Sequence, residues 1–229
     1  IFVMAALVLI PSVSFAQKVN ILTEKNASNR EQYAAEYLQK KLNRLGFSAV
    51  VNGKKGEYRI SLSQAKDTAG LKKEGFSWTR KGKKILLQGN DGSGVIYVAQ
   101  HGSLNVPLMQ KDAPEMVLRG ACVGLQKTVY LPGHQVYEYP YTPENFPWFY
   151  DKEQWIQYLD MLVDNKMNSL YLWNGHPFAS LVKLKDYPFA LEVDEATFKK
   201  NEEMFSFLTR EADRRGSFVI QMFYNIILS

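Results

Sequence analysis

The sequence predicts an α/β protein of two units: a small α/β sandwich over residues 17–113 and the first three strands of a truncated (β/α)8 barrel over residues 114–229. Three observations support this division. The first unit reads as a strand, a capped helix, several strands and a second helix. The second repeats strand, loop and helix, with long loops only after the strands. The formal net charge changes from +9 in the first unit to −4 in the second, which indicates a boundary near Pro114.

The composition narrows the class of protein. With 46% hydrophobic and 22% charged residues, the chain is neither disordered, collagen-like nor coiled-coil. Cys122 is the single cysteine, which excludes a disulfide framework and a multi-cysteine metal cluster. We expect Cys122 to be a buried small apolar residue. No H-E-x-x-H motif occurs, and no metal or cofactor is predicted.

The first sixteen residues have the pattern of a secretory signal peptide without its basic front. Residues 1–10 are apolar, and Ser14 and Ala16 occupy positions −3 and −1 of a cleavage site before Gln17. The run is too short to span a bilayer as a helix. We expect an exported protein, periplasmic or extracellular, that is not integral to the membrane after processing. The alternative is a buried N-terminal strand.

In the first unit, residues 19–22 form the first expected strand, and Ser28 with Glu31 makes a capping box for the helix that follows. Apolar residues then repeat at helical spacing until Gly46, which ends the helix. Further strands are expected at residues 49–51, 58–62, 76–79 and 85–88, the last two joined as a hairpin, with a second helix at residues 95–100.

Two features of this unit raise the question of anion binding. The glycine-rich turn at residues 89–94 precedes a helix, but it matches no phosphate-binding pattern and carries Asp91, so a structural turn is favoured. The basic residues, among them Lys54-Lys55 and the run from Lys81 to Lys84, are scattered over turns and helix faces. They match no nucleic-acid-binding module, so we expect a solvated surface and no nucleic-acid partner.

Residues 85–102 resemble the end of the accessory domain that precedes the barrel in family 20 hexosaminidases and family 67 α-glucuronidases. The shared pattern, I-x-G-x-D-x-x-G-x-x-Y in type, is carried here by Ile85, Gly89, Asp91, Gly94 and Tyr97. The resemblance covers about residues 17–105. It implies a structural front domain with a zincin-like fold and no metal site (a hexosaminidase domain 2-like unit).

In the second unit, apolar strands are expected at residues 116–125, 167–173 and 218–224, buried on both faces as in a parallel sheet. Asp151 and Asp194 cap the two intervening helices. Because each loop from strand to helix has about twenty or more residues and each return turn only a few, the pattern is typical of a (β/α) barrel with its active site at the carboxyl ends of the strands. A doubly wound sheet is the structural alternative.

The first long loop is rich in aromatic residues. Residues 130–150 hold 8 of the 30 aromatics of the chain, and four prolines stiffen the same stretch. Aromatic faces on a rigid loop suit the C–H faces of sugar rings. Packing of these side chains onto the protein core is an equally weighted alternative.

Polar and aromatic residues at strand ends are the candidate substrate-binding residues: Trp173, Asn174 and His176 after the second strand and Asn225 after the third. They would supply stacking and hydrogen bonds for a sugar, against the alternative of a packed Trp with loop-capping partners. Arg119 is the candidate for binding a sugar carboxylate, although it lies early in its strand.

Residues 155–178 resemble the first helix and second strand of family 20 and family 67 barrels, which show a Y-L-x-x-M-x-x-x-K-x-N-x-x-x-x-W pattern, and Arg119-Gly120 resembles their strand opening. Family 20 continues with an Asp and a second Arg, which this chain lacks, and this departure argues against a standard hexosaminidase. The sequence after Trp173 resembles the glucuronidase-like side, or a related exported glycosidase family of unsettled substrate. In both families the catalytic carboxylate follows the fourth barrel strand. This implies that no catalytic residue lies within residues 1–229.

We therefore expect the N-terminal part of an exported glycoside hydrolase that acts on poly- or oligosaccharides, inactive without the residues that follow. The alternative is a non-catalytic carbohydrate-binding surface protein that uses the aromatic loop at residues 130–150. The partner in both cases is a carbohydrate, whose sugar and linkage stay open.

Overall fold

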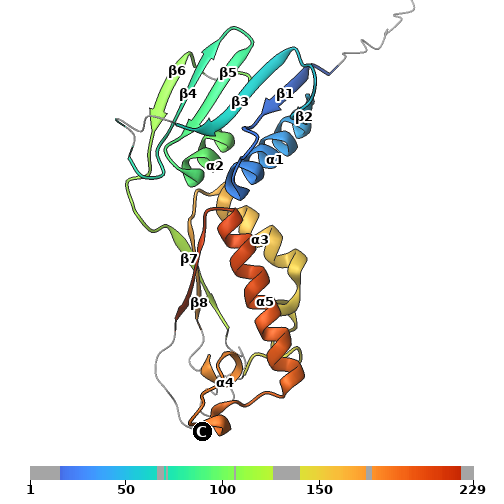
Figure 1. The fold of residues 1–229 in the computed structure, drawn as a ribbon, viewed down its shortest axis with the longest axis vertical. Helices are drawn as coiled ribbons and strands as arrows, with labels where there is room; N and C mark the ends of the chain where they lie inside the picture. The colour runs from blue at the N-terminus through green and yellow to red at the C-terminus, as the bar shows by residue number, and fades with distance from the viewer. Residues whose placement is uncertain are drawn as a thin grey trace, which may run out of the picture.

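The computed structural model describes residues 16–65, 70, 72–105, 107–125, 140–173 and 177–222. Within them the chain forms two sheets, one of six strands and one of three (Figure 1). In the view of Figure 1 the six-stranded sheet and its two helices lie above, and the three-stranded sheet lies below with two long helices beside it. The α/β class expected from the sequence is confirmed.

The first sheet is mixed and has the strand order β2-β1-β3-β5-β4-β6. Strands β1, β2, β3 and β5 are parallel, and β4 runs antiparallel to both β5 and β6. Strand β6 was not expected, because its sequence Met-Gln-Lys-Asp is polar and every residue of it is exposed. The strands are β1 (Lys18–Leu22), β2 (Ser48–Val51), β3 (Tyr58–Gln64), β4 (Phe76–Lys81), β5 (Lys84–Gly89) and β6 (Met109–Asp112).

Helices α1 (Asn29–Arg44) and α2 (Gly92–His101) pack on one face of this sheet and enclose its core. The predicted capping box is present, since the Ser28 hydroxyl accepts from the Glu31 N–H while the Glu31 carboxylate accepts from the Ser28 N–H at 2.9 Å. Gly46 follows α1 with φ of +86°, a conformation that favours glycine.

The glycine-rich turn before α2 is explained by close backbone packing. A Cβ atom at Gly89 would lie 2.1 Å from the Val95 nitrogen, and one at Gly94 would lie 2.3 Å from the Gly75 oxygen. The Asp91 carboxylate accepts from the Gly94 N–H at 2.9 Å and so caps the helix. The structural interpretation of this turn therefore accounts for its glycines and for Asp91.

The second sheet is parallel, with the order β7-β8-β9. As predicted, the Asp151 carboxylate accepts from the Gln154 N–H and the Asp194 carboxylate from the Thr197 N–H, which starts the two long helices. Two short 3-10 helices and a four-residue α-helix lie in the loops that lead into them. The elements are β7 (Gly120–Gly124), η1 (Pro147–Tyr150), α3 (Lys152–Asp164), β8 (Ser169–Trp173), α4 (Phe178–Leu181), η2 (Pro188–Ala190), α5 (Glu195–Arg214) and β9 (Phe218–Met222).

Three expectations for this sheet were wrong. Its strands are not evenly buried on both faces: Leu170 and Leu172 are fully buried against α3 and α5, whereas on the other face Tyr171 is half-buried and its neighbour Cys122 in β7 is exposed. Cys122 is accordingly exposed rather than a core residue. Strand β7 is also shorter than expected, because residues 116–118 are exposed and precede it.

Candidate functional site

Trp173 is the last residue of the central strand β8, at the carboxyl edge of the parallel sheet. In register it lies between Gly124 of β7 and Met222 of β9. A Cβ atom at Gly124 would contact the indole ring at 3.6 Å, so the glycine leaves the ring room on that side. The Trp173 carbonyl accepts from the Leu125 N–H at 2.7 Å, which extends the ladder to the edge of the sheet. The indole is half-buried and forms part of this edge.

The other candidate residues of this edge, Asn174, His176 and Asn225, lie outside the described residues, and their role stays a prediction. The described residues that end the three strands (Gly124, Leu125, Trp173 and Met222) include no carboxylate. This edge therefore offers an aromatic surface, without an acid or base among the described positions.

The described part of the aromatic loop, residues 140–150, forms core. Tyr141 and Phe149 are fully buried, with ring centroids 4.9 Å apart, and Phe146 is 2% exposed. The Phe149 carbonyl accepts from the Trp155 indole N–H at 2.8 Å, which fastens the loop to α3. In this part of the loop the packing alternative is correct. Tyr130, Tyr137 and Tyr139 lie outside the described residues.

A buried polar network behind the loop was missed by the sequence analysis. The Asn201 side-chain amide donates to the carbonyls of Tyr141 at 3.0 Å and Ser180 at 3.1 Å. Its oxygen accepts from the Tyr150 hydroxyl at 2.5 Å, and the Ser180 hydroxyl accepts from the Tyr141 N–H at 2.8 Å. Asn201 and Ser180 are fully buried. One residue of α5 thus joins the loop after β7 to the loop after β8.

One feature of the sequence could have indicated this buried network. Asn201 lies on the apolar side of α5 with Phe198, Met204 and Leu208, and a polar residue in that position must find partners. Burial raises the pKa of Tyr150, and the negative charge of Glu144 adds to the effect. The phenol therefore stays neutral and donates to Asn201.

Arg119 lies at the opposite edge of the parallel sheet, immediately before β7. Its guanidinium donates to the Glu74 carboxylate at 2.8 Å and to the Tyr97 hydroxyl at 2.7 Å. Two backbone carbonyls, of Lys166 at 2.8 Å and Met116 at 2.5 Å, accept from its remaining nitrogens. The predicted substrate-binding residues are therefore not brought together: Arg119 lies at the amino edge and Trp173 at the carboxyl edge.

Glu74 connects the two sheets at this amino edge. Its carboxylate accepts from Arg119 and from the Asn168 amide at 3.1 Å, while its N–H donates to Asp91 at 2.9 Å. Glu74 is 7% exposed and has φ of +58°, an uncommon conformation for a residue other than glycine. Asn168 also accepts from the Arg119 N–H at 2.8 Å, so one cluster fixes the starts of β7 and β8.

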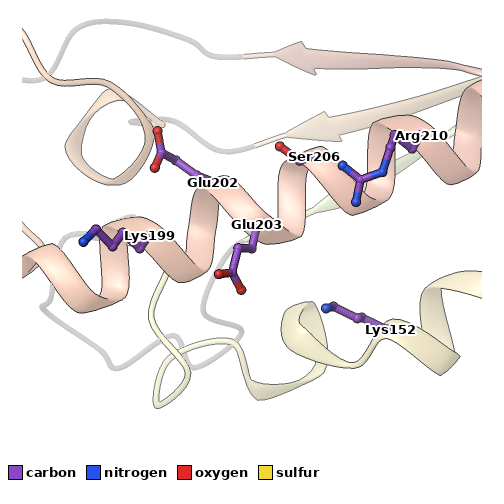
Figure 2. Close-up of a pocket in the computed structure, with 6 residues that line it drawn as sticks. All are labelled: Lys152, Lys199, Glu202, Glu203, Ser206 and Arg210. Carbon is purple, nitrogen blue, oxygen red and sulfur yellow. The ribbon is translucent and has the colours of Figure 1, made fainter.

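Two hollows elsewhere on the surface are lined mainly by charged side chains rather than by aromatic ones. Figure 2 shows one of them, with Lys199, Glu202, Glu203, Ser206 and Arg210 along α5 and Lys152 on α3. It has a volume of about 510 Å³ and carries charges of both signs, so it has no clear preference for a ligand charge. The second, about 670 Å³, lies between α1 and α3 and is lined by cationic residues of α1 and aspartates of α3. No group of metal-ligating side chains was found among the residues that the structure describes.

The comparisons with known proteins relate the first sheet and its helices to a known family of domains. Residues 9–113 match the family model described as glycosyl hydrolase family 20, domain 2. A solved structure described as a GH138 enzyme targeting pectin rhamnogalacturonan II is 58% identical, with a TM-score of 0.82 over 93% of this chain and 32% of its own. No curated protein matches the chain.

The chain is related to glycoside hydrolases through their accessory domain. Two enzymes share the fold at low identity: a β-N-acetylhexosaminidase from Bacteroides fragilis (16% identity, TM-score 0.52, 90% of this chain and 41% of that one) and a family 20 chitobiase from Flavobacterium johnsoniae (17%, 0.52, 90% and 31%). The chain spans about a third of the length of the GH138 enzyme. Residues 17–113 are called the accessory domain below.

The accessory domain contacts the second sheet through a further set of polar groups between α1 and the helices α3 and α5. The Asp160 carboxylate accepts from the Tyr33 hydroxyl at 2.8 Å and from the Arg215 guanidinium at 2.7 Å. Arg30 donates to Asp213 at 2.5 Å, and Tyr37 to Asp164 at 2.6 Å. With the Glu74 cluster, these bonds join the accessory domain to the amino side of the parallel sheet.

Proposed function

We propose that this chain is the N-terminal part of an exported glycoside hydrolase that acts on acidic plant-type polysaccharides or their oligosaccharides. In this proposal residues 1–16 are the signal peptide, residues 17–113 the accessory domain, and residues 114–229 the first strands of a (β/α)8 barrel. The catalytic carboxylates belong to strands beyond residue 229. No metal or cofactor takes part.

The observation that carries the proposal is the 58% identity, over 93% of the chain, to an enzyme described as targeting pectin rhamnogalacturonan II. The parallel order β7-β8-β9, with α3 and α5 on one face, supports a barrel start. Trp173 at the carboxyl edge supports a sugar-stacking surface, to which Asn174, His176 and Asn225 would add hydrogen-bonding groups.

Arg119 has a different role in this proposal from the one that the sequence suggested. Its donors are committed to Glu74, Tyr97 and two backbone carbonyls at the domain junction. The alternative of a binding protein that uses the aromatic loop has lost support, because the described aromatic residues of that loop, from Tyr141 to Tyr150, pack into the core.

The test is to compare the 229-residue chain with the encoded polypeptide extended beyond Ser229. Both are incubated with rhamnogalacturonan II, and released sugars are measured by chromatography. We expect release only by the extended form, because glycoside hydrolysis requires positioned carboxyl groups that the described strand ends do not supply. An extended form that binds the polysaccharide but releases no sugar would overturn the proposal in favour of a binding protein.

A further inference from the structure

A strongly basic hollow lies in the accessory domain, and none of its lining residues takes part in the bonds to the second unit described above. Its volume is about 350 Å³. Five of the eight residues that line it are cationic and one is acidic. The residues are Asn20, Lys54, Lys55, Gly56, Glu57, Arg59, Lys83 and Lys84. We call this the basic hollow. These lysines are scattered along the sequence, where a solvated surface was expected, but the fold brings them together.

The convergence follows from the parallel pairing of β3 and β5. Arg59, the second residue of β3, lies beside Lys84, its partner in β5, and Lys84 is in turn the partner of Lys81 in β4. Three exposed cations therefore form a row across three strands, on the face that α1 and α2 do not cover. Like charges directly opposite each other destabilise a sheet. A bound anion would relieve this repulsion.

The loop that supplies Lys54 and Lys55 is held in place. The Asn20 amide donates to the Gly53 carbonyl at 2.6 Å, and the Asn20 oxygen accepts from the Gly53 N–H at 2.9 Å. Asn20 is 2% exposed although it is polar. Gly56 packs so closely that a Cβ atom there would lie 2.8 Å from the Asn20 nitrogen. The two lysines are therefore presented from a fixed backbone, which lowers the entropic cost of binding.

The carboxylate that lines the basic hollow does not balance its positive charge. Glu57 is its single carboxylate and lies 3.5 Å from the Lys83 ammonium group. Among the described residues, Lys54, Lys55, Arg59 and Lys84 take part in no ion pair. Four cations thus surround a space large enough for one or two sugar rings.

The basic hollow lies far from the candidate sugar-binding edge. It is formed at the amino ends of β3 and β5, whereas Gly89 at the carboxyl end of β5 leads toward the junction with the parallel sheet. In Figure 1 the hairpin of β4 and β5 turns at the upper end of the molecule, and the loop containing α4 lies at the lower end. A ligand in the basic hollow would therefore leave the edge at Trp173 open.

We propose that the basic hollow is a second, non-catalytic glycan-binding site that recognises the carboxylates of a polyuronate chain. That the ligand is an anion follows from the four unpaired cations and their like-charge row. That it is a glycan rests on the proposed function. Arg59 supplies the planar donor pair that matches a carboxylate, and the lysines supply point charges on either side. The site would hold the enzyme on an acidic polysaccharide while another segment of the polymer reaches the carboxyl edge.

The experiment measures binding of polygalacturonate to the full chain by isothermal titration calorimetry at low and high salt, with fully methyl-esterified polygalacturonate as the neutral probe. The test variant is Lys54→Gln/Arg59→Gln/Lys84→Gln. The matched control is Lys25→Gln/Lys72→Gln/Lys73→Gln, which removes the same charge near the junction end of the same domain. Anionic phospholipid vesicles are the competing probe.

We expect the test variant to weaken polygalacturonate binding by about tenfold, and the control by less than about twofold, since each exposed charge pair contributes little alone. Binding of wild-type protein should weaken with salt and be absent for the esterified polymer. Equal loss of affinity in both variants would overturn the proposal. A protein that binds the anionic vesicles but does not bind polygalacturonate would overturn it as well. Hydrolysis by the extended protein, measured separately, reports on the proposed function and does not depend on this result.

Discussion

The Arg119 guanidinium and the Glu74 carboxylate meet at 2.8 Å between the two sheets, with side chains that are 13% and 9% exposed. The pair lies 45 residues apart in sequence and is surrounded by Tyr97 and Asn168. Its charges are largely shielded from water, and each has the other as its compensating group. Removing one of them leaves a buried charge without its partner.

Glu74→Gln should therefore lower the free energy of unfolding by about 3 kcal/mol, within the range for breaking a buried pair. Urea unfolding followed by circular dichroism measures the change. Glu57→Gln is the matched control, because its partner Lys83 is 62% exposed and the pair is 3.5 Å long. The control should change stability by less than about 1 kcal/mol. Equal effects of the two substitutions would contradict the shielding argument.

Asn201→Ala should destabilise the second unit by about 2–4 kcal/mol, because it leaves the carbonyls of Tyr141 and Ser180 and the hydroxyl of Tyr150 without their partner. Asn26→Ala, at an exposed position in the accessory domain, is the control and should be near neutral. Thermal unfolding measures both. The same midpoint for both variants would show that the network does not stabilise the loops.

Trp173→Ala should weaken binding of pectic oligosaccharides by about tenfold, since an aromatic contact contributes about 1 kcal/mol beyond its buried area. Trp173→Phe keeps an aromatic face and should lose less than about threefold. Titration calorimetry of the extended protein gives both constants. If alanine and phenylalanine lose affinity equally, stacking is not the contribution of this residue.

Alkaline pH should unfold the protein through its buried tyrosines. Burial, with the negative charge of Glu74, raises the pKa of Tyr97 to about 12. Because the folded-state pKa lies above the unfolded value of about 10, the stabilisation is complete below pH 10 and is lost as the pH rises toward 12. Burial also raises the pKa of Tyr33 and Tyr37.

Stability measured by urea unfolding should thus fall between pH 10 and pH 12. Tyr97→Phe should reduce the slope of that fall, and phenolate absorbance should rise together with unfolding. If phenolate forms in the folded protein well below pH 12, the burial argument for Tyr97 does not hold.

Local signals in the sequence predicted most helices and strands. The capping residues Ser28, Asp151 and Asp194 act over three residues, and all three accept the expected hydrogen bonds. Strand β6 was missed because it is polar and pairs only at one edge of the sheet. The exposure of Cys122 was missed because an apolar strand does not indicate whether both of its faces are covered.

The candidate site was less predictable for a physical reason. Asn201 contacts residues 60 and 21 positions away, and Glu74 contacts Asn168 at a separation of 94. Neither pairing leaves a periodic pattern in the sequence. The position of Arg119 was informative, because a residue at the start of a parallel strand lies at the amino edge of the sheet. Arg119 immediately precedes β7, at that edge. The basic hollow likewise depends on the register of β3 with β5.

Among the described residues, the polar bonds given above between the accessory domain and the second unit lie on the amino side of β7 and β8, whereas the loops that follow these strands are joined to each other through Asn201. Changes in the length or composition of the loops after β7 and β8 should therefore not alter the contacts that orient the accessory domain. If the proposed function holds, loops from related enzymes could be grafted onto this scaffold while the domain junction is kept, which would make substrate choice and domain assembly separable in engineering.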